Sequence, residues 1–416
     1  MNSSENSAAK TGFTVMAKPV GSRCNMRCDY CYYLECGGGF SMGDALLEKY
    51  IRGYIEACPG RTVQLSWHGG EPLIAGLDFY KKVVAIQEKY LPEGREIWNN
   101  LQTNGLLVND EWAEFFAENR FDVGLSVDGT AELHDKNRHD LGGNGTYSRA
   151  AAAVKCLQRH GIQPDLLCTV NADTAKFPTA VYRALRDMGT GWMQFIPVVR
   201  WDENGDLTAD SVTGEEYGKF LCAVFNEWIH NDLGKTEVQL FAESARVLSG
   251  HEASLCWMAK TCGRVIIVEA DGGVYSCDHF VEPKFLLGNL ESNALSTLAA
   301  ADFQLNFGAM KSDLPEKCCA CKCLALCNGG CPKDRVSVEG EKGINILCAG
   351  FERFFAFCEP KIRRVMDMTK RGMLPTDMMK ILREENRAIW RGVGRNDHCV
   401  CGNGKKAKHC CWELRA

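Results

Sequence analysis

Cys24-Asn-Met-Arg-Cys28-Asp-Tyr-Cys31 is the stretch on which the interpretation of this chain depends, because it places three cysteines within one short loop. Three thiolates so close together can converge on one metal centre, and such sulfur ligands select zinc or an iron–sulfur cluster. If no fourth cysteine joins them, one iron of a [4Fe–4S] cube keeps an open position that can bind a substrate molecule. An open position indicates catalysis, as it does at zinc.

The CxxxCxxC spacing resembles that of the radical S-adenosylmethionine (SAM) enzymes. This resemblance implies that the open iron chelates the amino and carboxylate groups of SAM. The alternative is a closed site, zinc or half of a ferredoxin, with Cys36 as the fourth ligand. Ferredoxin cysteines are spaced differently, which favours the radical SAM interpretation.

Composition places the protein among soluble globular chains. It has 416 residues, 45% hydrophobic and 24% charged, with room for two or three domains. A net charge of −5 gives no indication of a nucleic-acid partner. We find no apolar run near the roughly 20 residues of a membrane span and no signal-peptide pattern at the start, so we expect a cytoplasmic monomer. Its 23 cysteines are then mostly metal ligands, since the cytosol keeps thiols reduced.

The first half of the chain alternates short apolar runs with segments of helical period, a pattern typical of βα units. We expect residues 1–11 to be a disordered tail. The predicted strands are 13–18, 62–66, 96–101, 121–127, 165–170 and 192–198, and the predicted helices lie near 44–57, 76–90, 110–119, 146–160, 175–188 and 215–230. Six such units predict an α/β fold, a partial (β/α)6 TIM-type barrel.

Polar and glycine residues follow five of these strands, and in an α/β barrel those strand ends converge on one mouth. Taken alone, Gly69-Gly70-Glu71-Pro72 could be a simple turn. In second place after the cysteine loop, it resembles the radical SAM motif that holds the SAM amino group. Ser126 and Arg138 resemble positions that contact the ribose and carboxylate, although a surface ion pair is the alternative for Arg138. The predicted cofactor-binding residues are Gly69, Gly70, Glu71, Gln102, Asn104, Ser126, Arg138 and Phe195.

Beyond the barrel, a predicted hairpin turns at residues 271–273 and returns Cys277 beside Cys262. Counting thiols gives two groups of four: three cysteines around the hairpin with one later cysteine, and three of the later run with Cys348. Two [4Fe–4S] clusters or two structural zinc sites would satisfy this count. Cys319 and Cys323 exceed what is needed and leave the register open.

This cysteine pattern resembles the SPASM auxiliary-cluster domain of peptide-modifying radical SAM enzymes. The resemblance implies one auxiliary cluster on Cys256, Cys262, Cys277 and Cys331, and a second on Cys318, Cys321, Cys327 and Cys348. Over residues 12–365 the chain resembles the anaerobic sulfatase-maturating enzymes, whose motifs CNMRCDYCYY, HGGEP, LQTNG, GLSVDG and CNGGC occur here in the same order. His68 is a small departure, since a glutamine is often found there.

The family resemblance implies oxidation of a cysteine or serine in an unfolded sulfatase to Cα-formylglycine. It also implies three [4Fe–4S] clusters, SAM, and a flavodoxin- or ferredoxin-type electron donor. A SAM-derived radical would take a hydrogen from the target Cβ, and Asp278 matches the family's catalytic aspartate, although alone it would be a turn residue. Tyr33 resembles a substrate-binding residue or simply shields the cluster. The alternatives are a SPASM maturase that forms thioether or other crosslinks and a non-catalytic iron–sulfur or zinc scaffold or adaptor.

The chain ends with a CxC-x8-CC arrangement that resembles the zinc-binding SEC-C motif, with the ligands Cys399, Cys401, Cys410 and Cys411. So small a segment needs metal to fold, and we expect it to be separable from the catalytic domains. Its lysines indicate either a surface for an acidic partner, such as export machinery or the ribosome, or only a zinc-stabilised end. The predicted domains are 12–240 for the barrel, 250–368 for SPASM, 369–392 for a helical linker and 393–416 for the zinc motif.

Overall fold

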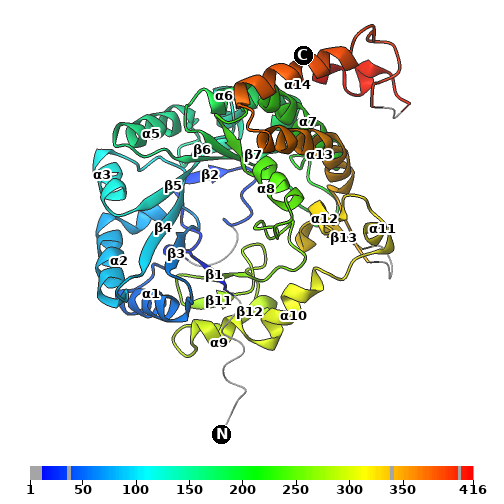
Figure 1. The fold of residues 1–416 in the computed structure, drawn as a ribbon. Coiled ribbons are helices and arrows are strands. Elements are labelled where there is room, and N and C mark those ends of the chain that lie inside the picture. Colours follow the sequence, from blue (N-terminus) through cyan, green and yellow to red (C-terminus); the bar gives the residue numbers. More distant parts are fainter. Residues whose placement is uncertain (1–11, 35–38, 338–341, 402–403, 416) are drawn as a thin grey trace.

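A computed structural model describes residues 12–34, 39–337, 342–401 and 404–415. The predicted tail at 1–11 and the alternative ligand Cys36 lie outside these residues. Six strands run parallel and pair in chain order, which confirms the partial barrel (Figure 1). They are β1 (Thr14–Ala17), β3 (Thr62–Trp67), β4 (Glu96–Thr103), β5 (Phe121–Ser126), β7 (Asp165–Val170) and β8 (Trp192–Pro197).

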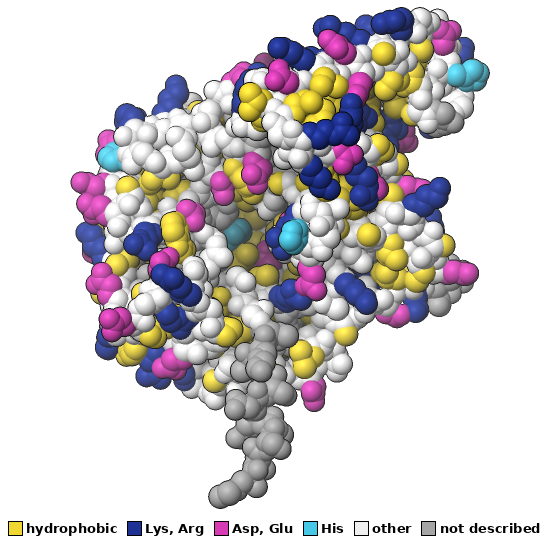
Figure 2. Space-filling view, viewed as in Figure 1, with side chains coloured by type: hydrophobic (Ala, Val, Ile, Leu, Met, Phe, Trp, Pro, Cys, Tyr) yellow, Lys and Arg dark blue, Asp and Glu magenta, His cyan; other side chains and the backbone are white. Residues whose placement is uncertain are grey.

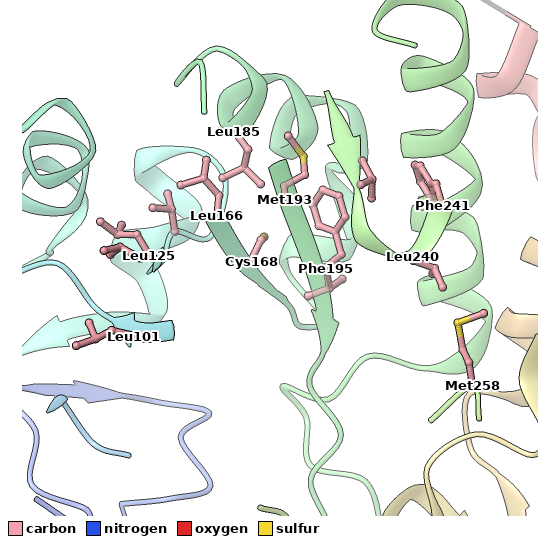
Figure 3. Close-up of a cluster of buried hydrophobic side chains, with 14 of the residues drawn as sticks. Leu101, Leu125, Leu166, Cys168, Leu185, Met193, Phe195, Leu240, Phe241 and Met258 are labelled. Carbon is pink, nitrogen blue, oxygen red and sulfur yellow. The ribbon is translucent and has the colours of Figure 1, made fainter. Parts of the chain in front are cut away.

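Helices cover the outside of this curved sheet (Figure 1). They are α1 (Asp44–Ala57), α2 (Leu77–Tyr90), α3 (Asp110–Glu118), α4 (Ala131–Asn137), α5 (Tyr147–Arg159), α6 (Pro178–Arg186) and α7 (Gly214–Asn231). Successive strand residues point to opposite faces. In β3, Val63 and Leu65 are buried, whereas Gln64 and Ser66 line an interior cavity of about 400 Å³. The apolar side chains of the strands therefore pack against the surrounding helices, as Figure 3 shows for β7 and β8. The alternate side chains, such as Gln64 and Ser66, face the barrel interior.

The cysteine-rich region continues the barrel sheet. Strand β10 (Val265–Val268) pairs parallel with β1, and β11 (Gly273–Tyr275) and β12 (Leu286–Asn289) follow it antiparallel. This confirms the hairpin predicted around residues 271–273. Its attachment to β1 was not predicted, and it brings the residues after β11 to the mouth of the barrel. Lys18, the residue just after β1, donates its backbone N–H to the carbonyl of Val268 over 2.8 Å.

The last two long helices pack on the end of the barrel. Phe354 of α13 (Cys348–Lys370) contacts Phe225 of α7 and Phe241 of α8 (Gln239–Leu248), with ring centroids 6.0 and 5.6 Å apart. Phe351 stacks on Trp257 at 4.7 Å. The aromatic face of α13 thus binds the barrel helices to the cysteine-rich region.

Residues of the predicted linker form α14 (Pro375–Ile389), which buries Met378, Met379 and Leu382. The other strands and α-helices are β2 (Met26–Cys28), β6 (Arg138–Asp140), β9 (Glu237–Val238), α9 (Leu295–Ala299), α10 (Asp302–Met310), α11 (Glu316–Cys319), α12 (Leu324–Cys327), β13 (Arg335–Val336) and β14 (Ile344–Asn345). Among the described helices, none is both long and apolar enough to cross a membrane.

Candidate active site and metal centres

The three-cysteine loop is fastened to the loop that follows β3. The Gly70 N–H donates to the carbonyl of Gly21 at 2.9 Å, and the Glu71 N–H donates to that of Arg23 at 2.8 Å. A Cβ on Gly70 would lie 2.1 Å from the Arg23 carbonyl oxygen, so only glycine permits this approach. The two loops are therefore positioned together.

Glu71 connects the second and third loops of the mouth. Its buried carboxylate accepts hydrogen bonds from Leu73 N–H at 3.0 Å, Thr103 Oγ1 at 2.8 Å and Asn104 N–H at 2.8 Å. Burial raises the pKa of Glu71 to about 7, although these donors oppose the shift. The side chain of Asn104 reaches to 3.7 Å from Cys24 Sγ. Glu71 thus fixes the position of Asn104, whose side-chain amide faces the cysteine loop.

Arg138 forms a buried ion pair, not the surface pair considered as its alternative. Its Nε lies 2.7 Å from Asp128 Oδ2, and the arginine is 7% exposed. Tyr30 Oη also donates to this carboxylate, as does the Thr169 N–H at 2.8 Å. Burial would raise the pKa of Asp128, but the Arg138 guanidinium holds it below its usual value. Strands β2 and β6 pair in a register that sets Cys28 opposite Arg138. The positive charge of Arg138 therefore lies beside the cysteine loop.

The remaining predicted cofactor residues are placed differently from one another. Gln102 donates to Ser126 Oγ at 3.1 Å. The ring of Phe195 instead packs on Phe220 of α7, with centroids 5.2 Å apart, while its neighbour Gln194 lines the interior cavity. Because strand residues alternate, Phe195 faces the helices, and its ring does not contribute to the mouth.

These residues fit a [4Fe–4S] cluster with SAM beside it. Cys24, Cys28 and Cys31 interact electrostatically with one another, so the three thiols face a common space. Burial raises the pKa of the Cys24 thiol to about 12 and of the Cys28 thiol to about 11, as expected of ligands shielded from water. The glycine at position 70 and the amide at 104 border that space.

Lys18 is the centre of a second charged network, which the sequence pattern did not reveal. Its ammonium, 1% exposed, lies 2.6 Å from Asp278 Oδ1 and 3.8 Å from Glu269 Oε1. It also sits 3.5 Å from the centroid of the Tyr33 ring. Burial would raise the pKa of Asp278, but the charge of Lys18 holds it well below its usual range. One cation thus joins two carboxylates of the hairpin to the barrel.

Two neighbouring tyrosines complete the network. Tyr33 is buried and donates to Glu269 Oε2 at 2.6 Å. Tyr32, which is 44% exposed, donates to Asp278 Oδ2 at 2.5 Å. The exposed aromatic ring at the mouth is therefore that of Tyr32. Tyr33 is buried and contacts Lys18 and Glu269. The sequence pattern indicated Asp278 and Tyr33 separately, and it gave no signal that Lys18 and Glu269 join them.

The electrostatic interactions among the auxiliary cysteines are compatible with the two predicted groups, and Cys323 also interacts with Cys321 and Cys327 of the second group. Cys277 interacts electrostatically with Cys331 and Cys256, and Cys256 acts on Cys262. In the second set, Cys348 interacts electrostatically with Cys327, Cys318 and Cys321. Asn328, Gly329 and Gly330 adopt φ of 45°, 74° and 66°, and this turn separates the last ligand positions of the run. Eight thiols in two sets of four fit two closed [4Fe–4S] clusters.

The tail cysteines are packed more closely. The sulfur atoms of Cys399, Cys401, Cys410 and Cys411 all lie within 4.8 Å of one another, which among the described residues is true of no other all-cysteine set. Cys401 and Cys410 are 3.4 Å apart, as are Cys410 and Cys411. Hydrogen bonds from the other cysteines lower the pKa of the Cys399 thiol to about 7, although burial opposes this. The set fits one tetrahedral ion.

Comparison with known proteins gives matches over most of the chain. The family model of the Radical SAM superfamily matches residues 19–174, and that of the SPASM iron–sulfur cluster-binding domain matches 256–322. A serine-type anaerobic sulfatase-maturating enzyme from Bacteroides thetaiotaomicron is 38% identical over 403 residues, 90% of this chain and 96% of the relative. A cysteine-type enzyme from Clostridium perfringens is 31% identical over 86% of this chain and 99% of its own length.

Solved structures give the same grouping. The structure of native anSMEcpe with bound AdoMet and Cp18Cys peptide has a TM-score of 0.81, with 31% identity over 86% of this chain and 99% of that chain. Streptococcus suis SuiB bound to its precursor peptide SuiA has a TM-score of 0.58 at 14% identity, a likeness of fold alone.

Proposed function

Since this chain belongs to the anaerobic sulfatase-maturating enzymes, a radical SAM family with a SPASM domain, we propose that it oxidises a cysteine or serine of an unfolded sulfatase to Cα-formylglycine. The observation that carries this proposal is the position of Asp278. The hairpin that pairs with β1 holds this carboxylate 2.6 Å from buried Lys18, next to the three-cysteine loop. This position supports Asp278 as the base, because Tyr32, the residue after Cys31, donates to the same carboxylate.

Cys24, Cys28 and Cys31 would hold a [4Fe–4S] cluster, which with SAM would supply the radical that takes one hydrogen atom from the target Cβ. The second electron of the oxidation would leave through the auxiliary clusters that the SPASM cysteines would hold, and a thioaldehyde would then be hydrolysed to the aldehyde. Asp278 accepts the proton of the target thiol or hydroxyl. Lys18 keeps this carboxylate ionised and fixes its direction, and general bases work only within hydrogen-bonding reach of their proton. Tyr32, which already donates to Asp278, offers its exposed ring to the peptide. Figure 2 shows this face hollowed near its centre, where an extended chain could enter.

The reaction is tested with the anaerobically reconstituted enzyme, SAM, a reductant, and synthetic Cys-x-Pro-x-Arg and Ser-x-Pro-x-Arg peptides. We expect the mass loss and aldehyde reactivity of formylglycine with one or both peptides. A crosslinked product without an aldehyde would identify a different peptide maturase, and no SAM cleavage would favour the scaffold alternative.

The role of Asp278 is tested by Asp278→Asn, with Asp271→Asn as the control on the same hairpin. Asp271 accepts a hydrogen bond from the Gly273 N–H at 2.9 Å, which asparagine can replace. We expect Asp278→Asn to lower peptide oxidation by about 10²–10⁴-fold, the usual contribution of a general base, while SAM cleavage continues. Unchanged formylglycine production would contradict the assignment.

Further parts of the proposal concern the surroundings of the enzyme. We propose that a flavodoxin- or ferredoxin-type donor reduces it and that it acts in the cytoplasm as a monomer. We also propose that the tail binds one zinc ion. Zn–S bonds of about 2.3 Å place the sulfurs of a tetrahedron about 3.8 Å apart, close to the 3.4 Å separations of the tail thiols.

A further inference from the structure

Arg353 connects the cysteine tail to the catalytic part of the chain. It lies in the second turn of α13, and its Nη2 donates to the Cys410 carbonyl at 3.1 Å. The same nitrogen lies 3.9 Å from Cys410 Sγ and 3.7 Å from Cys411 Sγ. The arginine is half-buried, and among the ion pairs of the described residues none involves Arg353. Its hydrogen-bond partners in the tail are thus sulfur atoms and a carbonyl.

Charge on the tail sulfurs would add to the partners that the barrel already gives Arg353. Glu215 and Cys222 of α7 interact electrostatically with its guanidinium, and a half-buried guanidinium is stabilised by each further counter-charge. Four thiolates around a divalent ion carry two net negative charges, which accept charge-assisted hydrogen bonds from arginine. Partners of this kind orient metal ligands and influence metal affinity.

The helix that carries Arg353 begins at Cys348, a predicted ligand of the second auxiliary cluster. The two are five positions apart, about 7.5 Å along a helix axis. The first turn of α13 is also pressed against α7: a Cβ on Gly350 would lie 2.2 Å from the Gly214 carbonyl oxygen. A displacement of this turn would therefore reach Cys348.

The tail also contacts α7, α14 and the residue after α14. Asn386 donates to the Leu414 carbonyl at 3.1 Å, and the rings of Trp390 and Trp412 meet edge to face at 6.1 Å. Figure 1 shows the tail following α14 at the end of the molecule where α13 and α7 lie. The tail is thus docked, in contrast to the separable module expected from sequence.

We infer that the tail is a metal clasp: zinc on Cys399, Cys401, Cys410 and Cys411 creates the anionic surface that Arg353 binds, and this contact steadies the first turns of α13 and the Cys348 ligand. The inference rests on the proposed zinc site and is independent of the sulfatase reaction. Arg353 is a positioning residue, since it acts on the metal through the cysteines.

The zinc site is tested first, in the full-length reconstituted enzyme, by X-ray absorption at the zinc K-edge. This measurement is element-specific, so iron does not obscure it. We expect one zinc per chain with four sulfur neighbours at about 2.3 Å. Nitrogen or oxygen ligands, or iron in place of zinc, would overturn both the zinc site and the clasp. The formylglycine assay tests the proposed function separately, so neither result changes its interpretation.

The clasp is tested by Arg353→Gln, with Arg363→Gln as the control on the same helix, where exposed Arg363 pairs with Glu359. We expect Arg353→Gln to transfer zinc to a chelator about 10–100-fold faster and to increase hydrogen exchange over residues 348–358. Arg353→Lys keeps the positive charge but loses the planar set of guanidinium donors. Its rate of zinc release should lie between those of the wild type and Arg353→Gln. Zinc release from both Arg353 variants at the wild-type rate would refute the clasp.

Discussion

The three-cysteine loop and the four-cysteine tail are both short segments that we propose to bind metal, yet their surroundings differ. The loop is bordered by buried ionisable groups, Glu71, Asp128 and Arg138, of which Asp128 and Arg138 form an ion pair and Glu71 holds Asn104. The tail contacts one half-buried arginine, and its four thiols close on each other. A site that must bind and orient a reactant needs fixed charges around an open position, whereas a structural site needs only a complete set of ligands.

The sharpest way to separate the two sites is to remove one ligand from each. We expect Cys28→Ser to reduce SAM cleavage to background, because the first cluster loses one of its three ligands. Cys401→Ser should keep SAM cleavage near the wild-type level while losing zinc. The measurements are 5′-deoxyadenosine release and metal content. Equal loss of SAM cleavage in both variants would show that the two sites are not functionally distinct.

Lys18→Met removes the cation on which the charged network at the mouth depends. Asp278 and Glu269 would then share a buried space without a counter-charge, so we expect formylglycine production to fall by about 10²–10⁴-fold. SAM cleavage should persist, because the side chain of Lys18 is directed to Asp278, Glu269 and the Tyr33 ring; exposed Lys49→Met serves as the control. A proportional fall of both products would instead indicate that Lys18 supports the cluster itself.

Gly70→Ala tests how tightly the cysteine loop is built into the barrel. The new methyl group would meet the Arg23 carbonyl at 2.1 Å, and we expect a loss of about 1–3 kcal/mol in stability, together with lower iron content. Gly53→Ala is the matched control, because nothing lies within 4 Å of its Cβ in α1. Chemical denaturation and iron analysis distinguish the two, and similar behaviour would mean that the loop can move freely.

The smallest effect concerns pH. His134 is buried beside the loop network, where its Nδ1 accepts from the Asp128 N–H at 3.2 Å, and burial followed by the Arg138 charge lowers its pKa to about 4. Because the folded pKa lies below the unfolded value, the folded state loses stability as pH falls through this interval, by about 2 kcal/mol between pH 7 and 5.

His134→Gln should flatten this part of the pH dependence, measured by denaturant unfolding at pH 7 and pH 5. Exposed His251→Gln should leave the slope as it is in the wild type. Equal slopes in all three proteins would show that His134 does not report on the loop network.

Local patterns in the sequence determined most of the fold. The alternation of apolar residues located the six barrel strands to within one or two residues, because the pleat repeats every second residue. Cysteine spacing likewise separated an open three-ligand loop from a closed four-ligand tail. The spacing did not show on which side of β8 the ring of Phe195 lies. The ring packs on Phe220 of α7, so any contact of this position with a cofactor would come from its backbone.

By itself, then, the sequence determined the inventory of metal ligands, the order of the βα units and the family to which the chain belongs, since spacing and periodicity are local properties. Only the tertiary structure decided what surrounds those ligands. Tyr32 and Asp278 are 246 residues apart and meet because β10 pairs with β1. Long-range packing likewise brings Lys18 to Glu269 and Arg353 to Cys410. Charges buried by long-range packing acquire their partners from the fold, and no pattern along the chain records those partners.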